Sequence, residues 1–314
     1  LEVHFLDIGQ GDSALLFCGE ETMLIDGGKV KNNQKLIARL KELEVDHLDA
    51  VICSHPDEDH CGGLSAVLAS TRTDAFYCSV DSWHTKVFSD VTKYVAEQGI
   101  SVTIPQAGDT FAFSDASVEF LGPVVDYGDD PNEGSLVARV RYGETSFLFT
   151  GDMGFEAEDD MLSANVDVSA TVLKVAHHGS AGSSSTEFLQ AVHPQYAVIS
   201  VGADNDYGHP TEAALNRLSA CGIPVYRTDL LGEIIAVSDG KTVTITSASN
   251  EAPPASDAAS QTAGSYGYVG NSSSKVVHLA SCGKLPGESN RVYFASLDEA
   301  LAAGYRKHAN CLGN

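Results

Sequence analysis

Apolar residues recur along the first 246 positions in short runs whose spacing changes between that of strands and that of helices. Alternating runs cover residues 3–8, 13–17 and 21–25, and turns rich in Gly and Asp separate them. Residues 33–43 then carry apolar side chains with helical spacing, and an apolar strand over residues 50–53 follows. The pattern predicts a β-meander that continues into a β-α-β unit.

The same alternation continues toward position 246. Helices are expected over residues 155–163, 184–192 and 211–221. The order indicates an α/β fold in which two mixed sheets carry helices on their outer faces. Further strands are expected over residues 75–80, 101–104, 117–121, 135–142, 146–150, 172–176, 196–201, 224–227, 232–238 and 242–246.

The composition changes after position 246. Residues 247–274 hold too few large apolar side chains for a core and predict a flexible linker. Within residues 275–314, a strand over 291–294 and a helix over 297–303 are expected. The sequence therefore predicts a large domain over residues 1–246, a linker, and a small α+β module.

The composition is that of a globular protein. The 314 residues are 43% hydrophobic, which is ample for a sizeable core. No apolar stretch approaches the roughly 18 residues of a membrane-spanning helix, and the first residues read as an amphipathic strand, not an export signal. Seven cysteines without dense spacing leave the redox compartment open.

The charge is unevenly distributed. Residues 1–246 hold 14 basic and 38 acidic side chains, a formal charge of −24, whereas residues 275–314 carry +2. An acidic domain attracts cations and weakens general affinity for nucleic acid. The charge weighs against a nucleic-acid substrate, although bound divalent ions would invert the local potential at a site.

The run S-H-P-D-E-D-H-C-G-G over residues 54–63 concentrates potential metal ligands behind an apolar segment. Strand-like alternation directs His55, Asp57 and Asp59 to one side while His60 diverges, so the run can grip two ions. The alternative is a solvated acidic loop that happens to contain two histidines. The metal site is favoured because later segments supply further ligands.

Three later segments supply these ligands. The apolar run F-L-F-T-G-D ends at Asp152, whose carboxylate can bridge two ions, although an aspartate there could also cap a helix. The run K-V-A-H-H-G-S offers His177 and His178, of which one can ligate and the other support it, with a narrow preference for His178 as the ligand. His209 lies in a Gly/Pro loop, where it is either an acid or base facing substrate or an ordinary loop histidine.

Taken in order, these motifs resemble the metallo-β-lactamase superfamily, and within it the hydrolase domain of the ComEC-type DNA-internalisation proteins. The resemblance covers residues 1 to about 246 and implies an αββα sandwich, a two-metal site and hydrolysis. The shared motifs are L-D-x-G-Q-G-D, I-D-G-G, S-H-P-D-x-D-H-x-G-G, N-x-x-S-L-V, T-G-D, H-H-G-S and G-H-P, at residues 6–12, 25–28, 54–63, 132–137, 150–152, 177–180 and 208–210.

The resemblance also implies roles for individual residues. His55 and Asp57 would hold one ion, and the second would be held by Asp59, His60 and His178. Asp152 would bridge the two. The groups expected to take part in catalysis are Asp59, His177 and His209. Asp26 is expected to support the metal loop by hydrogen bonds, and the other residues expected around the site or at its mouth are Gln10, Asp12, Asn132 and Ser135.

Two departures from the superfamily pattern bear on the metal. Asp57 replaces the second histidine, and no histidine occurs between His84 and His177, so Asn132 and Ser135 occupy that stretch. The first site is therefore rich in oxygen ligands. Such ligands favour Mn²⁺ or Mg²⁺, with Zn²⁺ as the alternative.

The C-terminal module has its own ligand pattern. His278 and Cys282 form one pair and His308 and Cys311 a second, a spacing that suits a structural zinc. The alternative is a disulfide between the two cysteines, because a module this small needs one staple or the other. The module resembles the metal-binding domain of the Ada DNA-repair proteins and similar tails on secreted nucleases, with His308 at a position usually held by cysteine. The matching residues are Asn290, Arg291, Phe294, Glu299, Ala300, Gly304 and Tyr305.

Two functions are consistent with the sequence. The favoured one is an extracytoplasmic or secreted metal-dependent phosphodiesterase, a nuclease whose basic tail engages DNA. The alternative is hydrolysis of a non-nucleic phosphodiester, such as a phosphocholine ester on a cell-wall polymer, with the tail as an anchoring or binding module. The sequence leaves the oligomeric state open.

Overall fold

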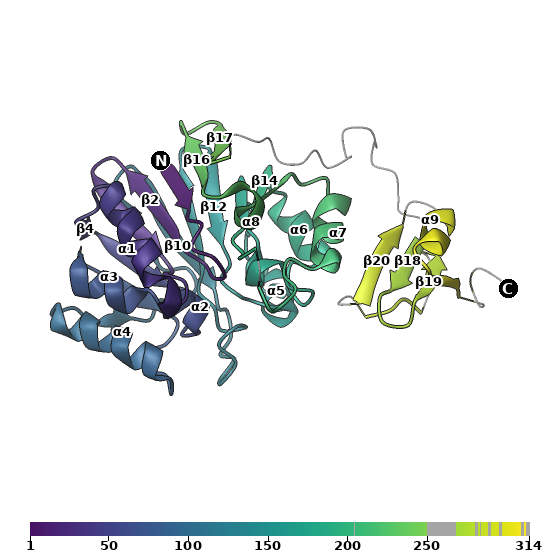
Figure 1. Cartoon of the computed structure of the whole chain (residues 1–314), viewed down its shortest axis with the longest axis horizontal. Helices are drawn as coiled ribbons and strands as arrows, with labels where there is room; N and C mark the ends of the chain where they lie inside the picture. Colours follow the sequence, from purple (N-terminus) through teal and green to yellow (C-terminus); the bar gives the residue numbers. More distant parts are fainter. Residues whose placement is uncertain are drawn as a thin grey trace.

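The computed structural model shows a large two-sheet domain followed by a small C-terminal sheet (Figure 1). The structure describes residues 1–203, 205–249, 268–279, 282, 284–287, 290–294, 297–308 and 311. Within them, no helix combines the length and apolar character that crossing a bilayer requires.

The first sheet of the large domain has eight strands in the order β17-β16-β1-β2-β3-β5-β7-β8. Its N-terminal strands form the predicted antiparallel meander, and β5 and β7 continue it in parallel. The strands are β1 (Glu2–Phe5), β2 (Ala14–Cys18), β3 (Glu21–Ile25), β5 (Ala50–Cys53), β7 (Phe76–Cys78), β8 (Val102–Thr103), β16 (Ile234–Ser238) and β17 (Val243–Ser247). A separate short pair joins β4 (His47–Leu48) to β6 (Arg72–Thr73).

The second sheet has seven strands in the order β15-β14-β13-β12-β11-β10-β9. Its strands from β9 to β12 pair antiparallel and those from β12 to β15 pair parallel. The strands are β9 (Thr110–Phe113), β10 (Ala116–Gly122), β11 (Val137–Tyr142), β12 (Thr145–Phe149), β13 (Val172–Lys174), β14 (Tyr196–Ile199) and β15 (Val225–Arg227).

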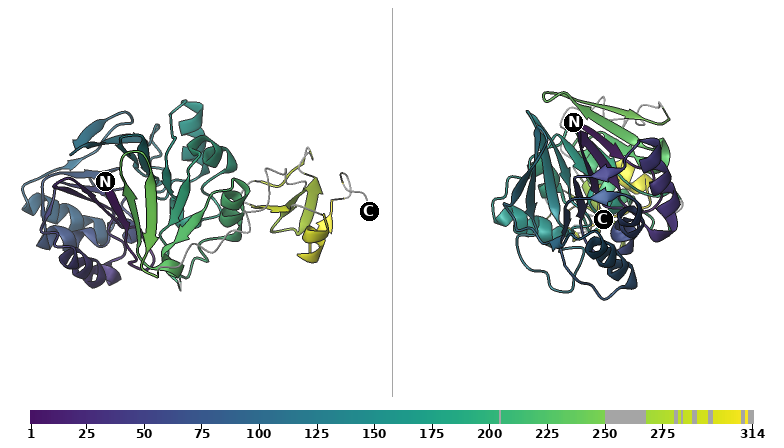
Figure 2. Two further views of the ribbon diagram at one scale, coloured as in Figure 1. Left: turned by 90° about the horizontal axis from the view of Figure 1, so that it is seen from above. Right: turned by 90° about the vertical axis from the view of Figure 1, so that its left-hand side faces the viewer.

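Helices cover the outer face of each sheet (Figure 2). One core cluster lies between the sheets and includes Phe5, Leu16 and Phe147, and two others lie between each sheet and its helices. The predicted αββα sandwich is therefore confirmed. The first sheet carries α1 (Asn33–Glu42), α3 (Leu64–Ser70) and α4 (Lys86–Glu97), the second carries α5 (Phe155–Ser163), α6 (Thr186–Val192) and α7 (Glu212–Ala220), and the short helices are η1 (Val30–Asn32), α2 (Glu58–Cys61), η2 (Ala176–Gly179) and α8 (Thr228–Leu231).

The C-terminal residues form a four-stranded sheet in the order β20-β18-β19-β21. The structure differs here from the predicted linker over 247–274, because residues 268–271 form a strand that pairs with both β19 and β20. Tyr268 packs against the small core cluster that includes Val277 and Phe294, so this end of the stretch has an apolar partner. Residues 250–267 of that prediction lie outside the described residues. The elements are β18 (Tyr268–Asn271), β19 (Val276–Leu279), β20 (Arg291–Phe294), α9 (Leu297–Ala302) and β21 (Arg306–Lys307).

Candidate metal centre and C-terminal Cys/His site

The predicted ligands of the large domain come from loops that leave strands of both sheets. The run after β5 continues into α2, the turn after β12 carries Asp152, and η2 after β13 carries both adjacent histidines. The loop before β2 approaches α2 closely, since the Asp12 amide donates to the Asp59 carbonyl at 3.0 Å. Gly11 allows this approach, because a Cβ there would lie 2.4 Å from the same carbonyl oxygen.

Three buried histidines present the same ring atom to the centre. His55, His60 and His178 are all at most 1% exposed. Their Nδ1 atoms are engaged at 3.0 Å by the Ser54 hydroxyl, at 2.9 Å by Asp26 Oδ2 and at 2.9 Å by the Ser200 carbonyl, respectively. Each Nε2 lacks a hydrogen-bond partner among the described residues. Buried unpartnered imidazole nitrogens with engaged opposite nitrogens are the arrangement that metal-binding histidines adopt.

The Asp152 carboxylate lies between these histidines. Its Oδ1 is 3.0 Å from His60 Nε2, and its Oδ2 is 3.6 Å from the Nε2 atoms of both His177 and His178. The Asp152 side chain is buried, and its backbone amide donates to the Ser135 hydroxyl at 3.1 Å. This is the place that a bridging carboxylate would occupy.

The charged groups around this carboxylate lie close enough to shift one another's pKa values. Burial alone would raise the pKa of Asp152, but His60 and His178 hold it well below its usual range. Burial likewise opposes protonation of His178, yet Asp152 and Asp12 raise its pKa to about 10. His55 differs, because burial and the charge on His60 lower its pKa to about 3. The buried carboxylates therefore favour positive charge at this place, which divalent cations could supply.

The remaining predicted ligands are more open. Asp59 Oδ2 lies 3.6 Å from His178 Nε2, with its side chain 19% exposed. Asp57 Oδ2 lies 3.9 Å from His55 Nε2, with its side chain 40% exposed. Burial and repulsion from Asp59 raise the pKa of Asp57, whose carboxylate would gain from a nearby cation.

Asp26 lies behind the metal loop. Its carboxylate accepts hydrogen bonds from the Ser54 amide at 2.7 Å and the Ser54 hydroxyl at 2.8 Å, as well as contacting His60 Nδ1. Asp26 also has a φ of 59°, in the left-handed region, so its backbone turns sharply to aim the side chain at the loop. The Asp26 carboxylate therefore connects the backbone of the metal loop, at Ser54, to the ring of His60.

Asp12, expected around the site or at its mouth, lies behind His178. It is only 5% exposed, and its Oδ1 is 3.1 Å from His178 Nδ1. Asp12, His60, Asp152 and His178 each offer an atom within 4.8 Å of the others. A buried carboxylate fits there because its partners are also buried.

One of these partners, Lys174, was not predicted as a site residue. Its Nζ lies 2.5 Å from Asp12 Oδ2 and donates to the Val175 carbonyl at 2.9 Å, with 3% of the residue exposed. Burial opposes ionisation of Asp12, but Lys174 and His178 lower its pKa. A lysine inside the otherwise apolar run over residues 172–176 is the sequence signal that could have revealed this pair.

His177 and His209 line the more open side. His177 has 31% of its side chain exposed, and its ring lies 5.5 Å from that of His209. His209 Nδ1 is buried with no hydrogen-bond partner in the described part of the chain. Burial and the charges of His178 and His177 lower its pKa to about 4. Both imidazoles can therefore meet a ligand of the cluster.

The three other predicted neighbours differ in their distance from the cluster. Ser135 Oγ lies 3.4 Å from His55 Nδ1 and also contacts the Asp152 amide. Gln10 is 6% exposed, and its Oε1 accepts a hydrogen bond from the Gly202 amide at 3.2 Å. Asn132 Oδ1 is buried, and no described atom donates a hydrogen bond to it.

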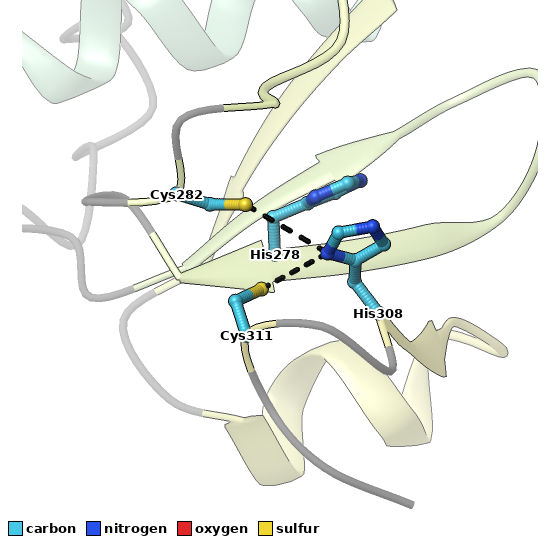
Figure 3. A group of neighbouring side chains, drawn as sticks. All are labelled: His278, Cys282, His308 and Cys311. Carbon is cyan, nitrogen blue, oxygen red and sulfur yellow. Dashed lines mark hydrogen bonds between the residues drawn. The ribbon is translucent and has the colours of Figure 1, made fainter.

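The C-terminal sheet gathers the second predicted ligand set (Figure 3). His278, Cys282, His308 and Cys311 each offer a ligand atom within 4.8 Å of the other three. His308 Nδ1 lies 3.2 Å from Cys311 Sγ and 3.7 Å from Cys282 Sγ, and the described cysteines include no disulfide. Tetrahedral zinc with N and S ligands at about 2.0–2.3 Å would place its ligands at comparable separations.

We expect Cys282→Ser to weaken the thiolate-to-Co²⁺ charge-transfer band of the cobalt-loaded full chain, because only the Cys311 thiolate then remains as a sulfur ligand. The band requires cysteine ligands, and the large-domain cluster offers none, so absorption spectroscopy isolates the C-terminal site. Cys221→Ser is the matched control, because this cysteine lies at the end of α7 and should leave the band intact. A band of undiminished intensity in Cys282→Ser would contradict the proposed ligand set.

The fold and the cluster together define a class of protein, an αββα sandwich with a buried Asp/His centre formed by loops of both sheets. The profile of the metallo-beta-lactamase superfamily matches residues 6–203, and the chain belongs to this superfamily. Proteins with this fold are generally metal-dependent hydrolases.

Curated relatives place the chain in the ComEC-type branch. It is 35% identical over 230 residues to Competence protein ComA of Neisseria gonorrhoeae, covering 73% of this chain and 31% of that protein. It is 31% identical over 251 residues to ComE operon protein 3 of Bacillus subtilis (strain 168), covering 74% of this chain and 32% of that protein. The chain thus spans about a third of the length of the curated relatives it matches.

Two solved structures support the fold alone. The metallo-beta-lactamase fold protein YhfI from Bacillus subtilis aligns with a TM-score of 0.50 and 12% identity, covering 78% of this chain and 99% of that one. A mutant of the CmlA beta-hydroxylase aligns with a TM-score of 0.51 and 14% identity, covering 74% of this chain and 53% of that one.

Proposed function

We propose that this protein is a metal-dependent phosphodiesterase that hydrolyses DNA. One observation carries the proposal: three buried histidine Nε2 atoms and Oδ1 of Asp152 converge without hydrogen-bond partners within the described residues. The names of two relatives, a competence protein and Recombination protein 2 of Haemophilus influenzae, favour a nucleic-acid substrate.

The donor set fits two divalent ions. His55 and Asp57, 3.9 Å apart, would hold one ion, and the other would be held by His60, His178 and Asp59. Asp152 would serve both, since its two oxygens lie near His60 and His178. When bound, paired divalent ions lower the pKa of a water molecule and stabilise the oxygens of an in-line displacement at phosphorus. The oxygen-rich first side favours Mn²⁺ or Mg²⁺, with Zn²⁺ as the alternative.

The chain's own residues prepare this reaction in three ways. The Asp26 and Ser200 hydrogen bonds fix the rings of His60 and His178, so their Nε2 lone pairs are directed before substrate arrives. On the exposed side, His209 is placed to orient the substrate phosphate and His177 to protonate the leaving oxygen. The buried sandwich core holds both groups of loops in one geometry.

The acidic surface favours a second candidate substrate. A formal charge of −24 on residues 1–246 opposes binding of a long polyanion, so a phosphocholine-type diester on a cell-wall polymer is the competing proposal. In the first proposal the tail, with a charge of +2, engages DNA; in the second it anchors the enzyme. Either substrate is consistent with the proposed extracytoplasmic or secreted location.

The test is hydrolysis by the full chain of single- and double-stranded DNA, bis-p-nitrophenyl phosphate and p-nitrophenyl phosphorylcholine, each with Mn²⁺, Mg²⁺ or Zn²⁺. We expect Mn²⁺-dependent cleavage of DNA and of the small diester, absent in Asp59→Ala. Cleavage of p-nitrophenyl phosphorylcholine by a chain that does not cleave DNA would favour the second substrate. If none of the four substrates is hydrolysed with any of the three metals, the proposed phosphodiesterase activity is refuted.

A further inference from the structure

A polar pocket of about 320 Å³ lies beside the metal centre, between η1 and the loop that precedes His209. Lys29 connects the two sites, because its Nζ lines the pocket at 4.0 Å from Asp59 Oδ2. Asn205 connects them on the opposite side, where its Nδ2 donates to the His209 carbonyl at 2.7 Å. A molecule whose reacting group lies on the metal cluster can therefore extend into this pocket.

Several hydrogen-bond donors that line the pocket have no acceptor to bind. Gln10 Nε2 and Asn32 Nδ2 are buried, and neither has a hydrogen-bond partner in the described chain. The Gln10 Oε1 accepts from the Gly202 amide, which directs the amide so that Nε2 is the unused group. Lys29 and the exposed Lys31 add two positive charges. Unused buried donors are costly, and this set suits an anion with several oxygens.

Two carboxylates also line the pocket, and their charges must be considered. Asp7 is already engaged, since its Oδ2 pairs with Lys35 Nζ at 2.9 Å and its Oδ1 accepts from the Gly9 amide at 3.2 Å. Asp206 lies at the exposed rim, where solvent screens its charge. Neither carboxylate removes the preference of the inner wall for an anion.

Tyr207 adds an aromatic surface at the rim. Its residue is 58% exposed, while its ring stacks on His209 at 5.8 Å with planes 23° apart. Lys29 Nζ lies 4.7 Å from the ring centroid and donates to the Tyr207 hydroxyl at 3.0 Å. The Tyr207 amide donates to Asn205 Oδ1 at 3.2 Å, which helps fix the loop. A fixed, exposed aromatic ring beside cations is the arrangement on which proteins stack unpaired bases.

We propose that this pocket binds a backbone phosphate next to the one being cleaved, while Tyr207 stacks an unpaired base. The inference rests on the proposed phosphodiesterase function and deepens it, because it selects single-stranded nucleic acid as the substrate class. A duplex keeps its bases paired and stacked, so it could reach the phosphate donors but not the Tyr207 ring. The local donors also explain how a polyanion can be held by an acidic domain.

The test measures binding, by fluorescence anisotropy, of a fluorescein-labelled twelve-residue thymidine strand and of a blunt duplex of equal length. The full chain carries Asp152→Asn to prevent turnover. Lys31→Gln should weaken strand binding several-fold and lower the slope of log affinity against log salt by about 0.7, the value for one lost phosphate contact on a single strand. Tyr207→Ala should weaken strand binding roughly tenfold and leave duplex binding unchanged.

The matched control is Lys41→Gln, which removes the same charge from an exposed position of α1 outside the pocket. Binding by Lys31→Gln and Tyr207→Ala that equals the control would overturn the inference, as would equal losses of strand and duplex binding in Tyr207→Ala. Hydrolysis of bis-p-nitrophenyl phosphate by the same variants with Asp152 restored separates the two proposals. If the unsubstituted chain does not hydrolyse bis-p-nitrophenyl phosphate, the proposed phosphodiesterase activity is contradicted. The comparison of strand and duplex binding tests the pocket whether or not hydrolysis is seen.

Discussion

Asp152→Asn is expected to lower Mn²⁺-dependent hydrolysis of bis-p-nitrophenyl phosphate by at least about 1000-fold, beyond the 10–100-fold typical for loss of an outer partner. The substitution preserves shape but removes the charge that faces His60 at 3.0 Å and His178 at 3.6 Å. An amide cannot supply two anionic oxygens to two ions. The measurement is kcat/KM over a series of metal concentrations, with bound metal counted in parallel.

The matched control for this prediction is Asp26→Asn, the same chemical change in a carboxylate one step further from the centre. Asp26 contacts His60 Nδ1 and Ser54 but presents no atom to the converging Nε2 group. We expect it to weaken metal affinity about 10–100-fold and to recover much of its activity at high Mn²⁺. Equal activity of Asp152→Asn and the unsubstituted protein would contradict the proposed role of Asp152 as a metal ligand.

Periodicity predicted most of the sandwich because most elements present one face to a core. The exception with the plainest cause is α4, which was not predicted although Phe88, Val91 and Val95 are buried along one side. These buried positions include two β-branched residues, which helices disfavour. Tertiary packing against the first sheet outweighs that local preference.

The candidate site was predictable where its residues are close in sequence. The run over residues 54–63 contains four proposed ligands, and strand ends elsewhere revealed Asp152 and the two adjacent histidines. The pairing of Asp12 with Lys174 was not predictable in this way, because it joins a loop of the first sheet to the end of strand β13 in the second. A motif places an acidic residue in a loop, whereas only the packed fold shows which buried cation neutralises it.

The second prediction with a large effect concerns stability. Arg217→Met is expected to lower the free energy of unfolding by about 3–5 kcal/mol, the cost typical of breaking a buried charge network. Arg217 is 2% exposed, and its guanidinium donates to the carbonyls of Ser184 and Ser183, each at 2.7 Å. Glu158 binds the same segment from its amide side, at Ser184 and at Ser185. Loss of the arginine leaves carbonyls unsatisfied and a carboxyl group without a neighbouring cation.

The effect should reach the metal centre, because this segment directly follows η2. His177 and His178 have φ values of 51° and 53°, a left-handed conformation that costs non-glycine residues about 1–3 kcal/mol each and persists only under external constraint. Thermal unfolding and Mn²⁺ titration should therefore change together in Arg217→Met. Arg141→Met removes an exposed arginine from β11 and should stay within about 0.5 kcal/mol of the unsubstituted protein. An unchanged melting temperature with unchanged metal affinity in Arg217→Met would show that the two histidines hold their strained backbone without this clamp.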